Sequence, residues 1–224
     1  MGTHVQSFLI ALQVFGGLPI NHHFNIMADL ITVVEYKDAE GLRGEKDDDR
    51  LNVIVPQVSD LVKKYCGISF IDFYSTDKVE TFSVDDNYTT TIIVSESPLV
   101  EVSKVEERAS YSGTYEELTT GDYEYYVDLE ADGIVRTTTS GKPIPFKQGV
   151  GAVRITYKAG YSTTPRDLQL ALFDLVNYYM KDEHKERRTL GGAQINNQGT
   201  AGIRNSTDFP DHIKRVLDLY RVVI

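Results

Sequence analysis

The feature of this sequence that most limits its fold is a double change in hydrophobic period. Apolar residues recur at helical spacing up to about residue 67, alternate toward a period of two between residues 71 and 161, and return to helical spacing after residue 162. This order predicts an α+β fold. We expect N-terminal helices and a long C-terminal helix to form a helical bundle. An antiparallel β-sandwich or barrel-like domain is inserted between them, and an extended arm follows at the C-terminus.

Two helices are predicted before the β region. Thr32 followed by Glu35 has the form of a capping box, which starts a short helix. The acidic run 47–49 stands where a helix N-terminus favours negative charge, and the helix behind it ends near Gly67. Pro56 falls inside this second helix, so we expect a kink or a break there.

Short strands with turn residues between them fill the β region. The strands are predicted at 78–84, 88–94, 99–107, 122–129, 133–139 and 152–158. The run Asp85-Asp86-Asn87 between the first two strands predicts a hairpin turn that joins them.

The stretch "VRITYKAGYSTTPRDLQLAL" predicts a structural corner, where the last strand gives way to the long helix. Gly160 permits a backbone turn that a larger residue would resist. Thr164 is a plausible N-cap with proline at the first helical position, and two tyrosines are expected to pack the β region onto the helix. The residues of this predicted corner are Tyr157, Gly160, Tyr161, Pro165 and Asp167.

The long helix carries an apolar face too wide for burial on one side. It is therefore either central in its own chain or buried against a second subunit. The candidates for a subunit interface are Leu168, Leu172, Phe173, Val176 and Tyr179.

A polar linker rich in glycine and asparagine follows, and then an amphipathic segment. A helix of that length is marginal alone in water, so the segment needs a surface to dock on, and the linker allows that surface to belong to another molecule. The divisions predicted along the chain are an extension at 1–26, helices at 27–70, the β insertion at 71–161, the long helix at 162–190, and a linker with a docking arm at 191–224.

The extension at 1–26 contains "FLIALQVFGGLPI", which is similar to the core of a signal peptide. No lysine or arginine precedes this run, and it is too short to span a bilayer, so we expect neither secretion nor a membrane anchor. The favoured interpretation is an extension upstream of Met27, and the alternative is an arm that packs on a neighbour.

Composition and motifs exclude several function classes. The net charge of −10 opposes tight, sequence-independent binding of nucleic acid, although an acidic wall could still face passing DNA. The single cysteine, Cys66, permits no internal disulfide, which fits a reducing cytoplasm, and its place on an apolar helix face predicts a core residue. None of the five histidines has metal-ligand spacing, and the sequence 140–142 lacks the first glycine of a P-loop. We therefore predict no enzyme activity, no cofactor and no metal.

Four segments occur in an order that resembles one known family. They are "DDRLNVIVPQVSDLVKKYCGISFID", "SPLVEVSKVE", "LTTGDYEYYVDLEADGIVR" and "AVRITYKAGYSTTPRDLQLALFDLVNYYM". Together they make residues 27–188 similar to the head-tail connector proteins of tailed bacteriophages, also called adaptor or head completion proteins.

The resemblance implies a structural protein of the virion neck, assembled in the host cytoplasm. Such proteins form a ring of about a dozen copies under the portal protein, extend the DNA channel without sequence-specific binding, and offer a platform for tail, nozzle or stopper proteins. The resemblance makes the C-terminal arm the candidate for docking on the portal, through Phe209, Ile213, Val216, Leu217, Tyr220, Val222 and Ile224. The alternatives are a stopper or tail-side component and, from another class, a carbohydrate-binding β-sandwich module.

Overall fold

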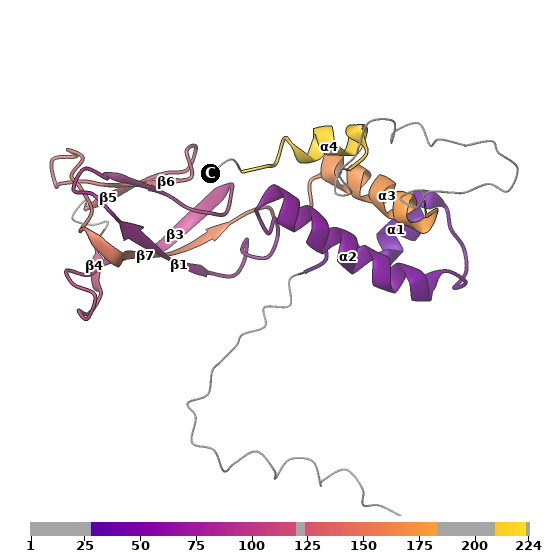
Figure 1. The fold of residues 1–224 in the computed structure, drawn as a ribbon, viewed down its shortest axis with the longest axis horizontal. Coiled ribbons are helices and arrows are strands. Elements are labelled where there is room, and N and C mark those ends of the chain that lie inside the picture. Colours follow the sequence, from indigo (N-terminus) through magenta and orange to yellow (C-terminus); the bar gives the residue numbers. More distant parts are fainter. Residues whose placement is uncertain (1–27, 120–123, 183–208, 223–224) are drawn as a thin grey trace, which may run out of the picture.

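The computed structural model describes residues 28–119, 124–182 and 209–222, which form two bodies placed end to end (Figure 1). One body is helical and holds α1 (Val33–Glu40), α2 (Asp48–Cys66), α3 (Arg166–Met180) and α4 (Asp211–Leu217). The other contains only strands. The predicted α+β class is confirmed, and each body has a hydrophobic core of its own.

The first two helices begin and end largely where local chemistry predicts. The Thr32 side chain accepts a hydrogen bond from the backbone N–H of Glu35, and the Glu35 side chain reaches back to the N-cap, so the capping box is present. Helix α2 ends at Gly67, which adopts a left-handed conformation. Of the kink or break expected at Pro56, the break is wrong, because α2 is one helix of 19 residues that includes this proline.

Helix α3 is the centre of the helical body. It packs against α2 and α4, and the Tyr36 ring of α1 lies 6.2 Å from the Phe173 ring. Of the two alternatives for its wide apolar face, the structure shows the first: the helix is central in its own chain. The helix starts at Arg166 with Pro165 as N-cap, one residue later than predicted, and Thr164 instead donates its hydroxyl to the Leu30 carbonyl.

The β body consists of two antiparallel sheets that share one core. Its strands are β1 (Lys78–Val84), β2 (Thr91–Ile93), β3 (Leu99–Glu107), β4 (Glu116–Leu118), β5 (Tyr125–Asp128), β6 (Gly133–Arg136) and β7 (Gly149–Ala159). The first sheet has the order β1-β7-β3-β4, and the second has the order β2-β6-β5. Among the described strands the two sheets do not join into a closed barrel.

The predicted hairpin between the first two strands is wrong. Strand β1 pairs with β7, whereas β2 pairs with β6, so the turn at Asp85-Asp86-Asn87 carries the chain from one sheet to the other. Asp86 stabilises this crossing, because its carboxylate accepts hydrogen bonds from the backbone N–H groups of Tyr88 and Thr89 and from the Thr89 hydroxyl. These bonds hold the pKa of the Asp86 carboxyl below its ordinary value.

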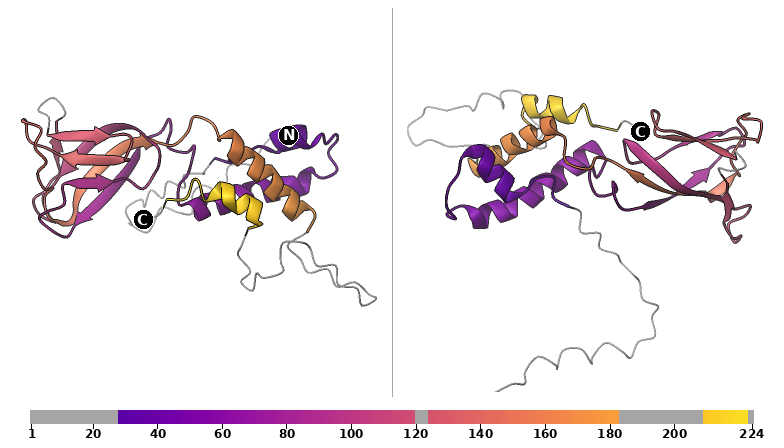
Figure 2. Two further views of the ribbon diagram at one scale, coloured as in Figure 1. Left: turned by 90° about the horizontal axis from the view of Figure 1, so that it is seen from above. Right: turned by 180° about the vertical axis from the view of Figure 1, so that it is seen from behind.

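The C-terminal arm, defined here as residues 209–222, does not extend away from the chain. Figure 2 shows α4 lying against α3 on the outside of the helical body, and side chains of the arm are part of the helical core. The expectation of an extended arm is therefore corrected. The physical reason is that an amphipathic segment buries its apolar face on the nearest apolar surface, and here that surface belongs to its own chain.

Candidate functional site

The place where the two bodies meet is the most constrained part of the molecule. The chain crosses there after α2, and it returns at the corner after β7. At Gly160 the backbone has a φ of 99°, and a Cβ atom added at this position would lie 1.9 Å from the Phe70 carbonyl oxygen. The same carbonyl accepts the Tyr161 N–H at 2.7 Å. The predicted corner therefore exists, and only glycine fits at its tightest point.

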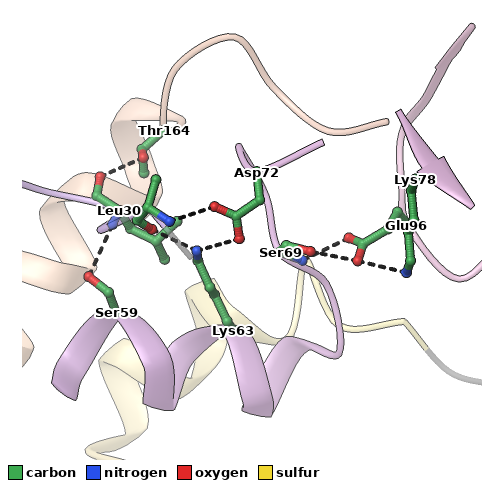
Figure 3. A network of polar contacts seen from close by, with 9 residues as sticks. Leu30, Ser59, Lys63, Ser69, Asp72, Lys78, Glu96 and Thr164 are labelled. Carbon is green, nitrogen blue, oxygen red and sulfur yellow. Dashed lines mark hydrogen bonds and ion pairs between the residues drawn. The ribbon is translucent and has the colours of Figure 1, made fainter. Parts of the chain in front are cut away.

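A buried lysine, Lys63, forms hydrogen bonds on the helical side of this junction (Figure 3). The Lys63 ammonium lies 2.7 Å from the Asp72 carboxylate and donates to the Ala28 carbonyl at 2.6 Å. Asp72 also accepts the Ala28 N–H at 2.8 Å. Both charged side chains are almost fully buried, so the pair satisfies groups that would otherwise be costly to bury.

A buried glutamate, Glu96, accepts hydrogen bonds on the β side of the junction (Figure 3). The Glu96 carboxylate accepts hydrogen bonds from the backbone N–H and hydroxyl of Ser69 at 2.8 and 2.6 Å. It also lies 3.0 Å from the ammonium of Lys78 on β1. Glu96, in the segment before β3, thereby links the turn after α2 to strand β1 and restrains the orientation of the two bodies.

We refer to these groups together as the joint: Ala28, Leu30, Ser59, Lys63, Ser69, Asp72, Lys78, Glu96 and Thr164. Sequence reasoning missed the joint. One signal was present, since Lys63 follows Val62 on the apolar face of α2, three residues before Cys66. A lysine on that face requires a buried partner, but its identity could not be read from spacing.

The two tyrosines of the predicted corner have different surroundings. Tyr157 is fully buried in the β core, and its hydroxyl donates to Glu80 at 2.7 Å. Burial raises the pKa of Tyr157 above its ordinary value. Tyr161 packs edge-on against the ring of Tyr220, with centroids 6.2 Å apart. Tyr157 therefore belongs to the β core and Tyr161 packs against the helical core and the arm, so the expectation that both rings pack the β region onto the helix is wrong.

The arm is anchored on the corner by polar contacts as well as by rings. The Tyr220 hydroxyl donates to Asp167 at 2.7 Å, and its ring packs against Phe70. The Val222 N–H donates to the Cys66 carbonyl at 3.0 Å. Asp167 and Tyr161, both predicted as corner residues, thus join the arm to the start of α3.

Most of the residues predicted to dock on the portal lie in the chain's own core. Phe209, Ile213 and Leu217 are buried, whereas Val216, Tyr220 and Val222 are partly buried against the same core. Ile224 lies outside the described residues. The apolar face of the arm therefore already has a partner within the chain.

The residues predicted for a subunit interface all pack in or against the core of the helical body. Leu168, Leu172 and Val176 are fully buried inside the helical body, so a contact with another subunit would need other side chains. Phe173 and Tyr179 are partly buried against that core, and their part in an interface stays a prediction.

The described residues provide little for chemistry. Cys66 is buried as predicted, and burial raises the pKa of its thiol to about 12, so it is not a reactive thiolate. No cluster of three His, Cys, Asp or Glu side chains that could hold a metal ion occurs in the part of the chain that the structure describes. Within the same residues, no helix is both long and apolar enough to cross a membrane.

Comparison with known families decides what kind of protein this is. The model of the head completion protein family matches residues 29–223, which include both bodies and the arm. The chain belongs to the head completion protein family. The resemblance to phage head-tail connectors, drawn above from the order of four segments, is thereby confirmed.

Individual relatives agree with this assignment. The head completion protein of Escherichia phage T5 is 29% identical over 97 residues, which are 42% of this chain and 49% of that protein. The match therefore spans about half the length of this curated head completion protein.

Solved structures with a similar fold come from necks of gene transfer agent particles. A chain from the neck of an empty particle, computed with C6 symmetry, matches with a TM-score of 0.53 at 16% identity and covers 87% of this chain and 91% of that one. A chain from the neck of a native particle, computed with C12 symmetry, has a TM-score of 0.51 at 14% identity and covers 88% and 95%. These similarities show that this head completion protein shares its fold with the two neck chains.

Proposed function

We propose that this head completion protein is a head-tail connector. Copies of it close into a ring under the portal protein, extend the DNA channel, and carry the tail, nozzle or stopper proteins. The observation that carries the proposal is the family match, because it runs through the helical body, the β body and the arm. Its site of action is the neck of the virion, after assembly in the host cytoplasm.

The proposal of a ring is supported by the fold. Chains of the same fold occur in particle necks computed with C6 and C12 symmetry. A ring forms when one surface of each copy contacts a different surface of the next copy and the rotation closes. We propose a ring of about a dozen copies on this basis.

A surface for the tail-side partner is proposed on the second sheet of the β body. Ile93 on β2 and Tyr126 on β5 are 67% and 61% exposed. They pair with Gly133 and Val135, which lie on the face of β6 opposite the buried Ile134. We propose that these two exposed apolar side chains, on either side of β6, contact the tail-side partner.

The arm remains the proposed contact with the portal. Because its inner face is buried, we propose that the outer face makes this contact, where Leu219 is 77% exposed. The acidic balance of the chain, with a net charge of −10, supports a channel that repels phosphate and lets DNA pass.

Native mass spectrometry of the purified chain with its portal protein tests the proposal. We expect a complex with about a dozen copies on the portal. Leu219→Glu should weaken it, while Leu129→Glu, at an exposed position of the β body, should not. A chain that stays monomeric and does not bind the portal would contradict the connector function.

A further inference from the structure

The arm packs on a surface formed by residues far from it in sequence, and this surface is called the groove below. Its walls come from the end of α2, the turn after it, and the start of α3. The groove residues that contact the arm are Tyr65, Cys66, Phe70, Tyr161 and Asp167. The groove and the arm are joined in the chain only through residues 183–208, so their contacts do not require that both belong to one copy.

The arm depends on this groove. Helix α4 has seven residues, which is too short for a stable isolated helix. The arm buries Phe209, Ile213 and Leu217. It is oriented by two hydrogen bonds, from the Tyr220 hydroxyl to Asp167 and from the Tyr65 hydroxyl to Asp218. An arm that leaves its own groove would recover these contacts by entering an equivalent groove of another copy.

The connection between α3 and the arm is far longer than the path it has to cover. At one end Asp182 lies 2.8 Å from Arg50, and at the other end the Phe209 ring lies 4.9 Å from the Tyr65 ring. Arg50 and Tyr65 are both on α2, about 22 Å apart at 1.5 Å per residue. The connecting segment of about 26 residues can span up to about 86 Å.

This excess length places the groove of an adjacent copy within reach. A neighbour packed beside the helical body would present its groove about three helix diameters away, which is about 30–35 Å. Every contact of the arm with its own groove can be made without change in the groove of an identical copy. In a closed ring such an exchange leaves no groove empty.

We propose that in the assembled ring each arm occupies the groove of the neighbouring copy, so that the groove is an interface between subunits filled by residues 209–222 of a second chain. This inference rests on the proposed ring. Before assembly the arm lies in its own groove, as the structure shows, and exchange then links each subunit to the next.

The natural cysteine provides a direct test. The Val222 N–H donates to the Cys66 carbonyl at 3.0 Å, so these residues are neighbours and Val222→Cys introduces a second thiol beside Cys66. Since Cys66 is the only cysteine, the variant can form just one kind of arm-to-groove link. Val222→Cys combined with Cys66→Ser is the matched control, and it should form no such link.

Oxidised samples are separated on a denaturing gel without reductant. The free monomer should give a link within one chain, and the assembled ring should give a ladder of covalently joined chains. A ring whose links all lie within single chains overturns the exchange but leaves the connector function standing. The absence of any ring with the portal overturns both.

A second measurement needs no variant. Oxidative coupling of Tyr161 to Tyr220, whose rings are 6.2 Å apart, is carried out on rings assembled from equal amounts of unlabelled and ¹⁵N-labelled chains. Mass spectrometry should find coupled peptides that carry one label and not the other. Coupled peptides with matching labels only would overturn the exchange.

Discussion

At the scale of single residues, Gly160 and Lys63 determine how the two bodies meet. Gly160 lets the chain turn under the Phe70 carbonyl. Lys63 pairs with the buried Asp72 carboxylate and donates to the Ala28 carbonyl. Both residues are buried within the chain, so their effect on assembly should arise through the folded state and can be measured as stability.

Gly160→Ala should destabilise the protein by about 3 kcal/mol or more, because the new Cβ would collide with backbone and the φ of 99° is strained for alanine. Gly141→Ala is the matched control. Gly141 also has a positive φ, of 76°, but its Cβ would meet no atom within 4 Å, so a loss of about 1 kcal/mol is expected. Urea unfolding measures both. Equal losses would show that the close approach to Phe70 does not constrain the corner.

Lys63→Met should cost about 3–5 kcal/mol, because it leaves the Asp72 carboxylate buried without its cation. Lys64→Met is the control on the exposed side of the same helix, and it should stay within about 0.5 kcal/mol of the parent. Adding Asp72→Leu to Lys63→Met should recover part of the loss. No recovery in the double variant would contradict the assigned pairing.

The pairing of Glu106 with Arg154 should make the stability of the protein depend on pH in the acid range. Its hydrogen-bonded pairing with Arg154, at 2.7 and 2.9 Å, lowers the pKa of the carboxyl from 4.5 to about 2. A lowered folded-state pKa contributes stability above the unfolded value, and this contribution is lost as pH falls from 4.5 toward 2. The stability difference between the parent and Glu106→Gln should therefore shrink across this window. A difference that is constant with pH would refute the contribution of this ion pair.

At the scale of the elements, the arm is part of the helical core and covers the only cysteine. Cys66 lies beneath it, with its sulfur 3.6 Å from the Leu217 carbonyl oxygen. The reactivity of this thiol therefore reports whether the arm is seated in its groove.

Leu217→Ala should cost about 2–5 kcal/mol, because it opens a cavity under the arm. The rate at which a thiol reagent modifies Cys66 should rise as the arm leaves the groove more often. Leu219→Ala is the control, since that side chain is 77% exposed, and it should change neither quantity. A Cys66 labelling rate that is the same in Leu217→Ala and in the parent would contradict the placement of the arm.

The elements also show which parts of the fold the sequence could predict. The capping box at Thr32 and the turn at Gly160 depend on neighbouring residues, and both were predicted correctly. The pairing of β1 with β7 depends on residues more than sixty positions apart, so the local hairpin signal at Asp86 was misleading. The short β4 (Glu116–Leu118) was missed because its sequence lacks a run of alternating apolar residues.

The candidate site was predictable only in part for the same reason. The corner residues carry local signals, but the partners of Lys63 and Glu96 are set by tertiary contacts. The amphipathic pattern of the arm correctly indicated that its apolar face needs a partner. It could not identify that partner as the chain's own α2 and α3, because a hydrophobic face is not selective among apolar surfaces.

At the scale of the whole molecule, two bodies with separate cores are held by one buried joint. Such a subunit can carry different contacts at its two ends while keeping their relative orientation fixed. The end-to-end arrangement of the two bodies (Figure 1) suits the proposed connector. We propose that the helical body and arm face the portal and neighbouring copies, and that the β body faces the tail.

Electron cryo-microscopy of the neck in particles that contain this chain tests the central claim most directly. We predict a closed ring between the portal and the tail, in which each subunit fits the two bodies and the joint without rearrangement. A neck that is fully accounted for by other proteins, with no density that fits this chain, would contradict the assignment of this head completion protein as a head-tail connector.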